Sequence, residues 1–195
     1  MGRDKAMLEF GGTPLVAQML ELLTGLGLRG RICGSRPDLE RFAEVVPDNF
    51  AQCGPLDGIE AALAVSDAEL NLFVPVDAPG LPAAFMRWMM VRAEESQAVA
   101  TIPRFGGRPQ PLCAVYSRRL GEGLRASLAA GNYKVMTAVR AAAAGLGEAV
   151  DAFDVESVAP TLSSGEWPTD RPMAAWFRNI NTLEEYARVQ VAGYR

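Results

Sequence analysis

The sequence of 195 residues predicts an α/β protein with a mainly parallel sheet covered by helices on both faces. Three observations support this fold class. Short apolar segments alternate with helical patterns over about the first hundred residues, as in repeated βα units. The segment 70–76 (LNLFVPV) is almost continuously apolar, which is typical of a strand buried on both faces. The turn Gly106-Gly107 between two later apolar segments indicates one antiparallel insertion.

The first half of the chain alternates regularly between the two patterns. Thr13 and Pro14 suit the N-cap and first position of a helix, and Gly25 suits its end. The turn sequence GPLDG precedes another helix. The expected helices are 13–25, 37–44, 59–65 and 82–95, and the expected strands are 31–33, 45–46, 70–76 and 98–102.

The second half begins with the antiparallel insertion. Segment 156–173 is rich in Ser, Pro and Thr and is expected to be a loop. Thr182 and Glu185 have the spacing of a capping box, which opens the last helix. The expected strands are 112–116, 150–155 and 176–177, and the expected helices are 120–130, 135–144 and 182–191.

Composition limits the classes of function. The net charge is −4 and the pI is about 5.0, which argues against a general nucleic-acid or anionic-membrane surface. No apolar segment approaches the ~18 residues of a membrane span. The chain has no histidine, and its three cysteines show no CxxC spacing. Histidine-based zinc sites and Ser-His-Asp or Cys-His catalysis are therefore excluded, and carboxylates, Lys, Tyr or amides must carry any chemistry.

The chain is expected to be one domain, 1–195, because this length suits a single core. An odd number of widely spaced cysteines and the lack of a recognisable signal peptide predict a cytoplasmic location. Neither GxxxxGK[ST] nor GxGxxG occurs, so the usual nucleotide-binding fingerprints are absent.

Asp77 is the main candidate for metal chemistry. It follows the apolar segment 70–76, and ligands of open α/β sheets bind beyond the carboxyl ends of strands. A single carboxylate at this place is a suitable ligand for Mg²⁺, which keeps several waters. The alternative is that Asp77 is a turn or helix-capping residue.

Four further polar residues are candidates for ligand binding. Asn179 and Asn181 stand on alternate positions and would face the same way, so they could orient a phosphate, a water or a metal-bound ligand. Arg104 and Arg108 flank the Gly-Gly turn and could meet a phosphorylated substrate. The alternatives are local turn chemistry for the asparagines and a solvated hairpin tip for the arginines.

Five segments, taken together and in this order, resemble the molybdenum cofactor guanylyltransferases, which are relatives of the sugar-nucleotide nucleotidyltransferases. The resemblance runs from Met1 to about Val191. It implies a Rossmann-like three-layer nucleotidyltransferase fold and a Mg²⁺-dependent enzyme that transfers GMP from GTP to the phosphate of molybdopterin (Mo-MPT) and releases pyrophosphate. The segments are MGRDKAMLEFGGTPL, GPLDGIEAAL, FVPVDAPGLP, RPQPLCAVY and NINTLEE.

The resemblance also implies roles for individual residues. Lys5 matches a lysine that meets the nucleotide phosphates, Asp48 an acidic residue associated with the guanine nucleotide, and Asp77 the Mg²⁺ ligand. Asn181 matches an active-site amide near the metal, and Gln110 lies in a segment closer to the guanylyl than to the cytidylyl branch. The expected catalytic residues are Lys5, Asp77 and Asn181, and the expected substrate-binding residues are Lys5, Asp48, Arg104, Arg108, Gln110 and Asn179.

The family signature implies chain before Met1. It reads Leu-Ala-Gly-Gly-x-Ser-x-Arg-Met-Gly-x-x-Lys and follows a buried strand, and only its last part is present at 1–5. The glycine-rich part would cradle the triphosphate with backbone amides. Without the strand, two strand edges in the core would be unpaired. The first strand and loop are therefore expected upstream of Met1.

Two alternatives to guanylyl transfer remain at this stage. One is the same fold acting with CTP or on a sugar phosphate, and the other is a non-catalytic nucleotide- or pterin-binding protein. The expected partners are GTP and molybdopterin, with transient contact to other cofactor-biosynthesis proteins or molybdoenzymes, and neither nucleic acid nor membrane.

Overall fold

The computed structural model describes residues 4–50, 52–158 and 172–178. Its helices are α1 (Leu15–Gly25), α2 (Pro55–Ala64), α3 (Ala83–Ser96), α4 (Gly121–Ala129), α5 (Val135–Leu146) and α6 (Val155–Val158), with short turns η1 (Lys5–Met7), η2 (Pro37–Leu39), η3 (Arg118–Leu120) and η5 (Met173–Ala175). Its strands are β1 (Glu9–Phe10), β2 (Thr13–Pro14), β3 (Ile32–Cys33), β4 (Val45–Val46), β5 (Leu70–Phe73), β6 (Ala100–Phe105), β7 (Arg108–Pro109), β8 (Ala114–Ser117) and β9 (Val150–Asp154).

The described strands form three separate sheets. The largest has five strands in the order β5-β8-β6-β7, with β9 paired to β6. Strands β3 and β4 form a parallel pair, and β1 and β2 form an antiparallel hairpin. Strand β8 runs antiparallel to both β5 and β6, which confirms the predicted antiparallel insertion. Parallel pairing is limited to β3–β4 and β6–β9, so the expected mainly parallel sheet is only partly present.

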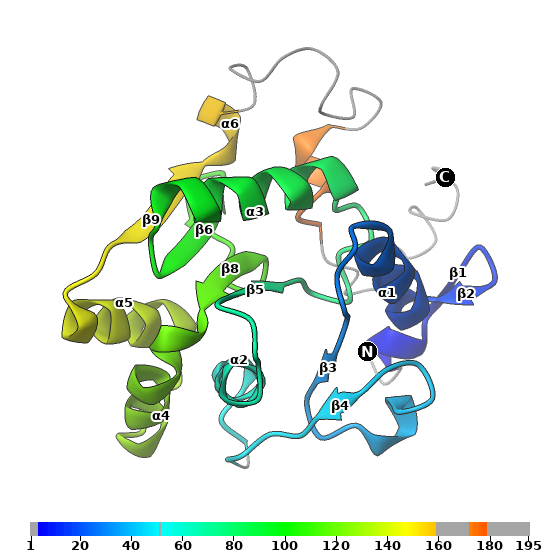
Figure 1. Ribbon diagram of the computed structural model, residues 1–195. Coiled ribbons are helices and arrows are strands. Elements are labelled where there is room, and N and C mark those ends of the chain that lie inside the picture. The colour runs from blue at the N-terminus through cyan, green and yellow to red at the C-terminus, as the bar shows by residue number, and fades with distance from the viewer. Residues whose placement is uncertain (1–3, 51, 159–171, 179–195) are drawn as a thin grey trace.

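Helices cover the largest sheet on both faces, as the sequence predicts. In Figure 1, α3 lies on one side of β5, β8 and β6, and α2, α4 and α5 lie on the other. Alternate residues of β8 serve the two layers: Ala114 and Tyr116 belong to the core beneath α2, α4 and α5, and Val115 belongs to the core beneath α3. Within the described residues, no helix is long and apolar enough to cross a membrane.

Two elements near the N-terminus differ from the prediction. Thr13 and Pro14 form β2, and the N-cap of the following helix is Pro14 instead of Thr13, because Thr13 pairs with Phe10 across the turn Gly11-Gly12, whose φ values are positive. Helix α1 therefore begins at Leu15. The predicted helix 37–44 is reduced to the single turn η2, because its apolar residues are too few to bury a longer helix.

Two differences concern the C-terminal third. The predicted strand 176–177 is wrong, because the Trp176 amide donates to the Met173 carbonyl in the turn η5. Trp176 is an apolar residue because its side chain packs in the core beneath α3, not because it belongs to a strand. The predicted loop 156–173 begins with the last residues of α6, and most of it lies outside the described residues. The predicted helix 182–191 also lies outside them.

Candidate functional site

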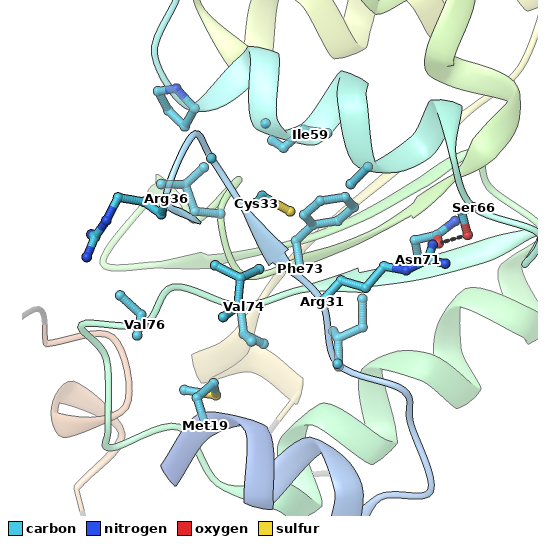
Figure 2. A pocket seen from close by; sticks show the side chains of 18 of the residues that line it. Met19, Arg31, Cys33, Arg36, Ile59, Ser66, Asn71, Phe73, Val74 and Val76 are labelled. Atoms are coloured by element: carbon cyan, nitrogen blue, oxygen red, sulfur yellow. Dashed lines mark hydrogen bonds between the residues drawn. The ribbon is translucent and has the colours of Figure 1, made fainter. Parts of the chain in front are cut away.

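A cavity of about 840 Å³ lies between the β3–β4 pair and the large sheet. Its walls come from β3, β5, α1 and α2 and are largely apolar, with Met19, Ile59, Phe73 and Val74 among them. Figure 2 shows that the two strand segments run in the same direction past the cavity, one from Arg31 to Arg36 and the other from Asn71 to Val76. In the described part of the chain, β3 pairs only with β4 and β5 only with β8.

Three polar residues lie just beyond the carboxyl ends of the strands around this cavity. Arg36 follows β3, Asp48 follows β4 and Asp77 follows β5. Arg36 and Asp48 line the cavity, as does Val76, the neighbour of Asp77. This end of the cavity is where open α/β sheets bind ligands.

Lys5 and Asp77 form an ion pair at the same end. The Lys5 Nζ donates to Asp77 Oδ2 at 2.8 Å, and the two side chains are 37% and 15% exposed. Lys5 is placed by η1, whose first turn is capped because the Asp4 carboxylate accepts the Ala6 amide at 3.1 Å. The fold thus brings together the lysine and the carboxylate that the resemblance assigns to the phosphates and to Mg²⁺.

Arg36 ties the Lys5 segment to the loop after β3. Its guanidinium donates to both carboxylate oxygens of Asp4 and to both of Asp38. The hydrogen bond from Arg36 lowers the pKa of the Asp38 carboxyl below its usual range. Arg36 was missed by sequence reasoning, since no local pattern links the sequence CGSR to Asp4.

Asp48 and Cys33 lie side by side where α2 passes close to β3 and β4. A Cβ on Gly58 would lie 3.3 Å from the Cys33 Cβ, which is a crowded contact, and 3.5 Å from Asp48 Oδ1, which is an ordinary one. The Asp48 amide donates to Ser35 Oγ at 3.3 Å. Cys33 is exposed to the cavity, and the protein around it shields the thiolate from bulk water. This desolvation and, secondarily, the negative charge of Asp48 raise the pKa of the Cys33 thiol to about 11, so Cys33 is a neutral thiol at pH 7. The expected nucleotide residue Asp48 therefore faces the cavity beside an uncharged group.

The arginines and the glutamine predicted to bind substrate do not line the cavity. Arg104 lies 3.5 Å from an Asp154 carboxylate oxygen, and the Gln110 amide side chain donates to the Arg108 carbonyl at 3.3 Å. All three belong to the β6–β7 hairpin and the turn after it, and Leu112 of the same turn does line the cavity. Among the described residues, the contacts of Arg104, Arg108 and Gln110 stay within this hairpin and its neighbour β9.

Asn179 and Asn181 lie outside the described residues. The chain just before them packs against the loop after Asp77: a Cβ on Gly80 would lie 2.3 Å from the Ala175 carbonyl oxygen. Trp176, in the same segment, is buried and contacts the Phe85 ring with centroids 5.5 Å apart.

The donor set suits a hard cation held by one carboxylate. The described residues contain no group of three or more His, Cys, Asp or Glu side chains that could enclose a metal. Asp77 supplies one carboxylate beyond the carboxyl end of β5, and one of its two oxygens accepts a hydrogen bond from Lys5. Mg²⁺ is commonly held by one or two carboxylates together with substrate phosphates and waters, so the residues present fit Mg²⁺.

Sequence reasoning also missed two buried acids of α2, Asp57 and Glu60. They are three positions apart among Leu56, Ile59 and Leu63, so the helical period places them beside the apolar face. This spacing in the sequence could have predicted that both carboxylates are buried.

Known proteins match both the sequence and the fold. Residues 1–145 match the family described as the MobA-like NTP transferase domain. A molybdenum cofactor guanylyltransferase of Cereibacter sphaeroides is 36% identical over 142 residues, which cover 69% of this chain and 71% of that one. Another from Xanthomonas euvesicatoria pv. vesicatoria is 31% identical over 191 residues, which cover 97% of this chain and 87% of that one.

A solved structure shows the same fold. Molybdopterin-guanine dinucleotide biosynthesis protein A from Archaeoglobus fulgidus superposes with a TM-score of 0.75 at 20% identity, covering 97% of this chain and 90% of that one. The Rossmann-like nucleotidyltransferase fold that the resemblance implied is confirmed. Since the sequence match spans most of the chain, the protein is a nucleotidyltransferase of the MobA-like NTP transferase family.

Proposed function

We propose that the protein transfers GMP from GTP to the phosphate of molybdopterin and releases pyrophosphate, as a molybdenum cofactor guanylyltransferase. The observation that carries this proposal is the Lys5–Asp77 pair at 2.8 Å, at the carboxyl end of β5. Family membership supports the reaction class, and the names of the relatives support the guanylyl group and the molybdenum cofactor.

Lys5 and Asp77 would each compensate a different charge in the reaction. In the reaction an oxygen of the molybdopterin phosphate bonds to the α-phosphorus of GTP, and the bond from that phosphorus to the bridging oxygen breaks, so pyrophosphate leaves. Lys5 would offset negative charge on the nucleotide phosphates, and Asp77 would hold Mg²⁺, which supplies further charge compensation when bound. No protein nucleophile is needed, which agrees with a chain that lacks histidine.

Asp48 would meet the base end of the nucleotide. Its carboxylate faces the cavity rim and could accept hydrogen bonds from guanine N–H groups. Cytosine offers a different set of donors, so a contact of this kind would favour GTP. Asn179 and Asn181 remain candidates for contacts near the metal, because the segment before them packs beside Gly80.

We also propose that a further strand and a glycine-rich loop, of the kind that the signature implies before Met1, complete the site. Support comes from the cavity edges: β3 and β5 each lack a pairing partner on the cavity side among the described residues. Unpaired backbone groups beside apolar walls are costly, and one extended segment would satisfy both edges. The loop after it would lie at the end that holds Lys5 and Asp77.

The test is product analysis. Protein incubated with GTP, Mg²⁺ and molybdopterin should form a dinucleotide that contains both the pterin and GMP, with one pyrophosphate per product. Binding of GTP without any product, in protein extended by the strand and loop, would favour the non-catalytic alternative. Contact with other cofactor-biosynthesis proteins or molybdoenzymes, and the cytoplasmic location, stay predictions of the sequence.

A further inference from the structure

Two acidic side chains inside the protein hold the segment that carries Asp48. Asp57 and Glu60 of α2 are each only 1% exposed. Taking an ionised carboxylate out of water costs several kcal/mol unless hydrogen bonds and opposite charges compensate it. The hydrogen-bond partners of the two carboxylates therefore indicate which part of the structure these buried charges stabilise.

Asp57 holds two consecutive backbone amides. Its Oδ1 accepts the Asn49 amide at 3.0 Å, and its Oδ2 accepts the Phe50 amide at 2.7 Å. Asp57 sits in the first turn of α2, where the helix dipole also favours a negative charge. Both oxygens are thus used on the two residues that directly follow Asp48.

Glu60 holds the side chain of Asn49 and is itself held by α4. Its Oε2 accepts from Asn49 Nδ2 at 2.9 Å. Its Oε1 accepts from Arg125 Nε at 2.8 Å and lies 2.7 Å from Arg125 Nη2. Asn49 is therefore fixed through its backbone by one carboxylate and through its side chain by the other.

The segment held in this way forms one wall of the cavity. Asp48, Phe50, Gln52 and Cys53 all line it. Gln52 has a φ of 61°, in the left-handed region that costs a residue with a side chain on the order of 1–2 kcal/mol. The two buried carboxylates fix the part of this wall next to Asp48, at Asn49 and Phe50.

We propose that Asp57 and Glu60 are positioning residues for recognition of the guanine base. By fixing Asn49 and Phe50 they hold Asp48 at the cavity rim, and they touch no nucleotide themselves. This inference rests on the proposed function, because the role of Asp48 comes from it. Its consequence is that the selectivity for GTP over CTP depends on two side chains buried beneath the wall.

The first test variant is Asp57→Asn, which keeps the size of the side chain. An amide can accept only one of the two backbone N–H groups and turns its own NH₂ toward the other. GTP affinity should fall at least fivefold, and CTP affinity should change less than twofold, because CTP shares the triphosphate but lacks the guanine donors. Glu122→Gln on the exposed side of α4 is the control and should change neither affinity.

A double variant separates positioning from stability. Glu60→Met with Arg125→Ala removes the buried carboxylate together with its half-exposed cationic partner, so no unpaired charge is left in the interior and stability should change little. The melting temperature should stay near that of the wild type, while GTP affinity falls because Asn49 has lost its side-chain acceptor. A double variant that keeps both the melting temperature and the GTP affinity of the wild type would show that Glu60 does not position Asp48, and would overturn the inference.

Hydrogen exchange distinguishes failure of the inference from failure of the proposed function. In Asp57→Asn without nucleotide, the Asn49 and Phe50 amides should exchange at least tenfold faster than in the wild type. Unchanged exchange, or equal losses of GTP and CTP affinity, would overturn the inference and leave the proposed function standing. A wild-type protein that binds CTP as tightly as GTP would instead contradict the role given to Asp48, and the positioning role with it.

Discussion

Lys5 Nζ lies 2.8 Å from Asp77 Oδ2, although the two residues are 72 positions apart in the chain. An ion pair with a lysine that is 37% exposed is weakly stabilising, typically 0–1 kcal/mol. The strand before Asp77 was expected to be buried on both faces, but β5 is only half-buried because one side of it lines the cavity. Stability alone gives little reason for a chain to place a carboxylate beyond the end of this strand, opposite a lysine. A binding site explains the arrangement, because the positive charge of Lys5 would act on nucleotide phosphates and the negative charge of Asp77 on a divalent cation.

The first prediction concerns Asp77. Asp77→Asn keeps the shape and loses the charge, so phosphate charge at the reacting centre goes uncompensated. Guanylyl transfer at saturating GTP and Mg²⁺ should fall by roughly 10²–10³, in line with other electrostatic stabilisers. The melting temperature should change little, because the pair is only weakly stabilising. Pyrophosphate release and a melting curve are the measurements.

The matched control for Asp77 is Glu94→Gln on the exposed side of α3, which should retain full activity. Wild-type turnover in Asp77→Asn would return Asp77 to the role of a turn residue.

The second prediction concerns Gly80, where two segments meet. Gly80→Ala places a methyl group 2.3 Å from the Ala175 carbonyl oxygen, so backbone must move. The free energy of unfolding should fall by about 1–3 kcal/mol, measured by denaturant titration. Gly145→Ala is the control, because a Cβ there meets nothing within 4 Å and alanine favours a helix. Equal stability of the two variants would show that the 172–178 segment does not pack on Gly80.

The third prediction concerns Cys33. Its pKa is raised to about 11, so its thiolate fraction keeps growing with pH well above pH 9. Alkylation of Cys33 in the folded protein should therefore rise about tenfold per pH unit from 8 to 10, whereas unfolded protein should level off near the ordinary value of 9.0. Asp48→Asn should speed alkylation at pH 8, because the neighbouring negative charge is gone. Mass spectrometry of the labelled peptide gives the rates. An alkylation rate at pH 8 that Asp48→Asn leaves unchanged would show that the charge of Asp48 does not act on the Cys33 thiol.

The fourth prediction concerns the cavity between β3 and β5. Fusing an apolar, β-branched strand and a Gly-Gly loop to the N-terminus should raise the melting temperature. Burial of a few apolar side chains would contribute at least about 2 kcal/mol, which corresponds to roughly 4–8 °C for a chain of this size. A Gly-Ser extension of the same length should leave the melting temperature unchanged. Equal melting temperatures of the two fusions would mean that the space does not take a strand.

Much of the fold could be predicted from local patterns. Helix α3 and strand β8 lie within a few residues of their predicted bounds, because their apolar residues recur at the helical and the strand period. The strand predicted to end at 76 ends at Phe73, where its pairing with Ala114 stops and Pro75 cannot donate to a ladder. Local pattern does not specify how far a neighbouring strand extends.

The candidate site shows the same limit. Lys5 and Asp48 came from a resemblance, whereas Asp77 was also predicted from its place after the apolar segment 70–76, and the structure places all three at one end of the cavity. Arg36, Asp57 and Glu60 act through partners that are distant in sequence, so their roles depend on the packing of α2 and of the loop after β3. Such contacts become visible only in three dimensions.

The most direct test of the whole account compares two nucleotides with the same triphosphate. Pyrophosphate release with molybdopterin and Mg²⁺ should give a kcat/KM for GTP more than tenfold above that for CTP, in protein carrying the N-terminal strand and loop. Tenfold corresponds to ~1.4 kcal/mol of discrimination in the transition state, which a carboxylate at the Asp48 position can supply. Equal kcat/KM values for GTP and CTP would contradict guanylyl transfer by this protein.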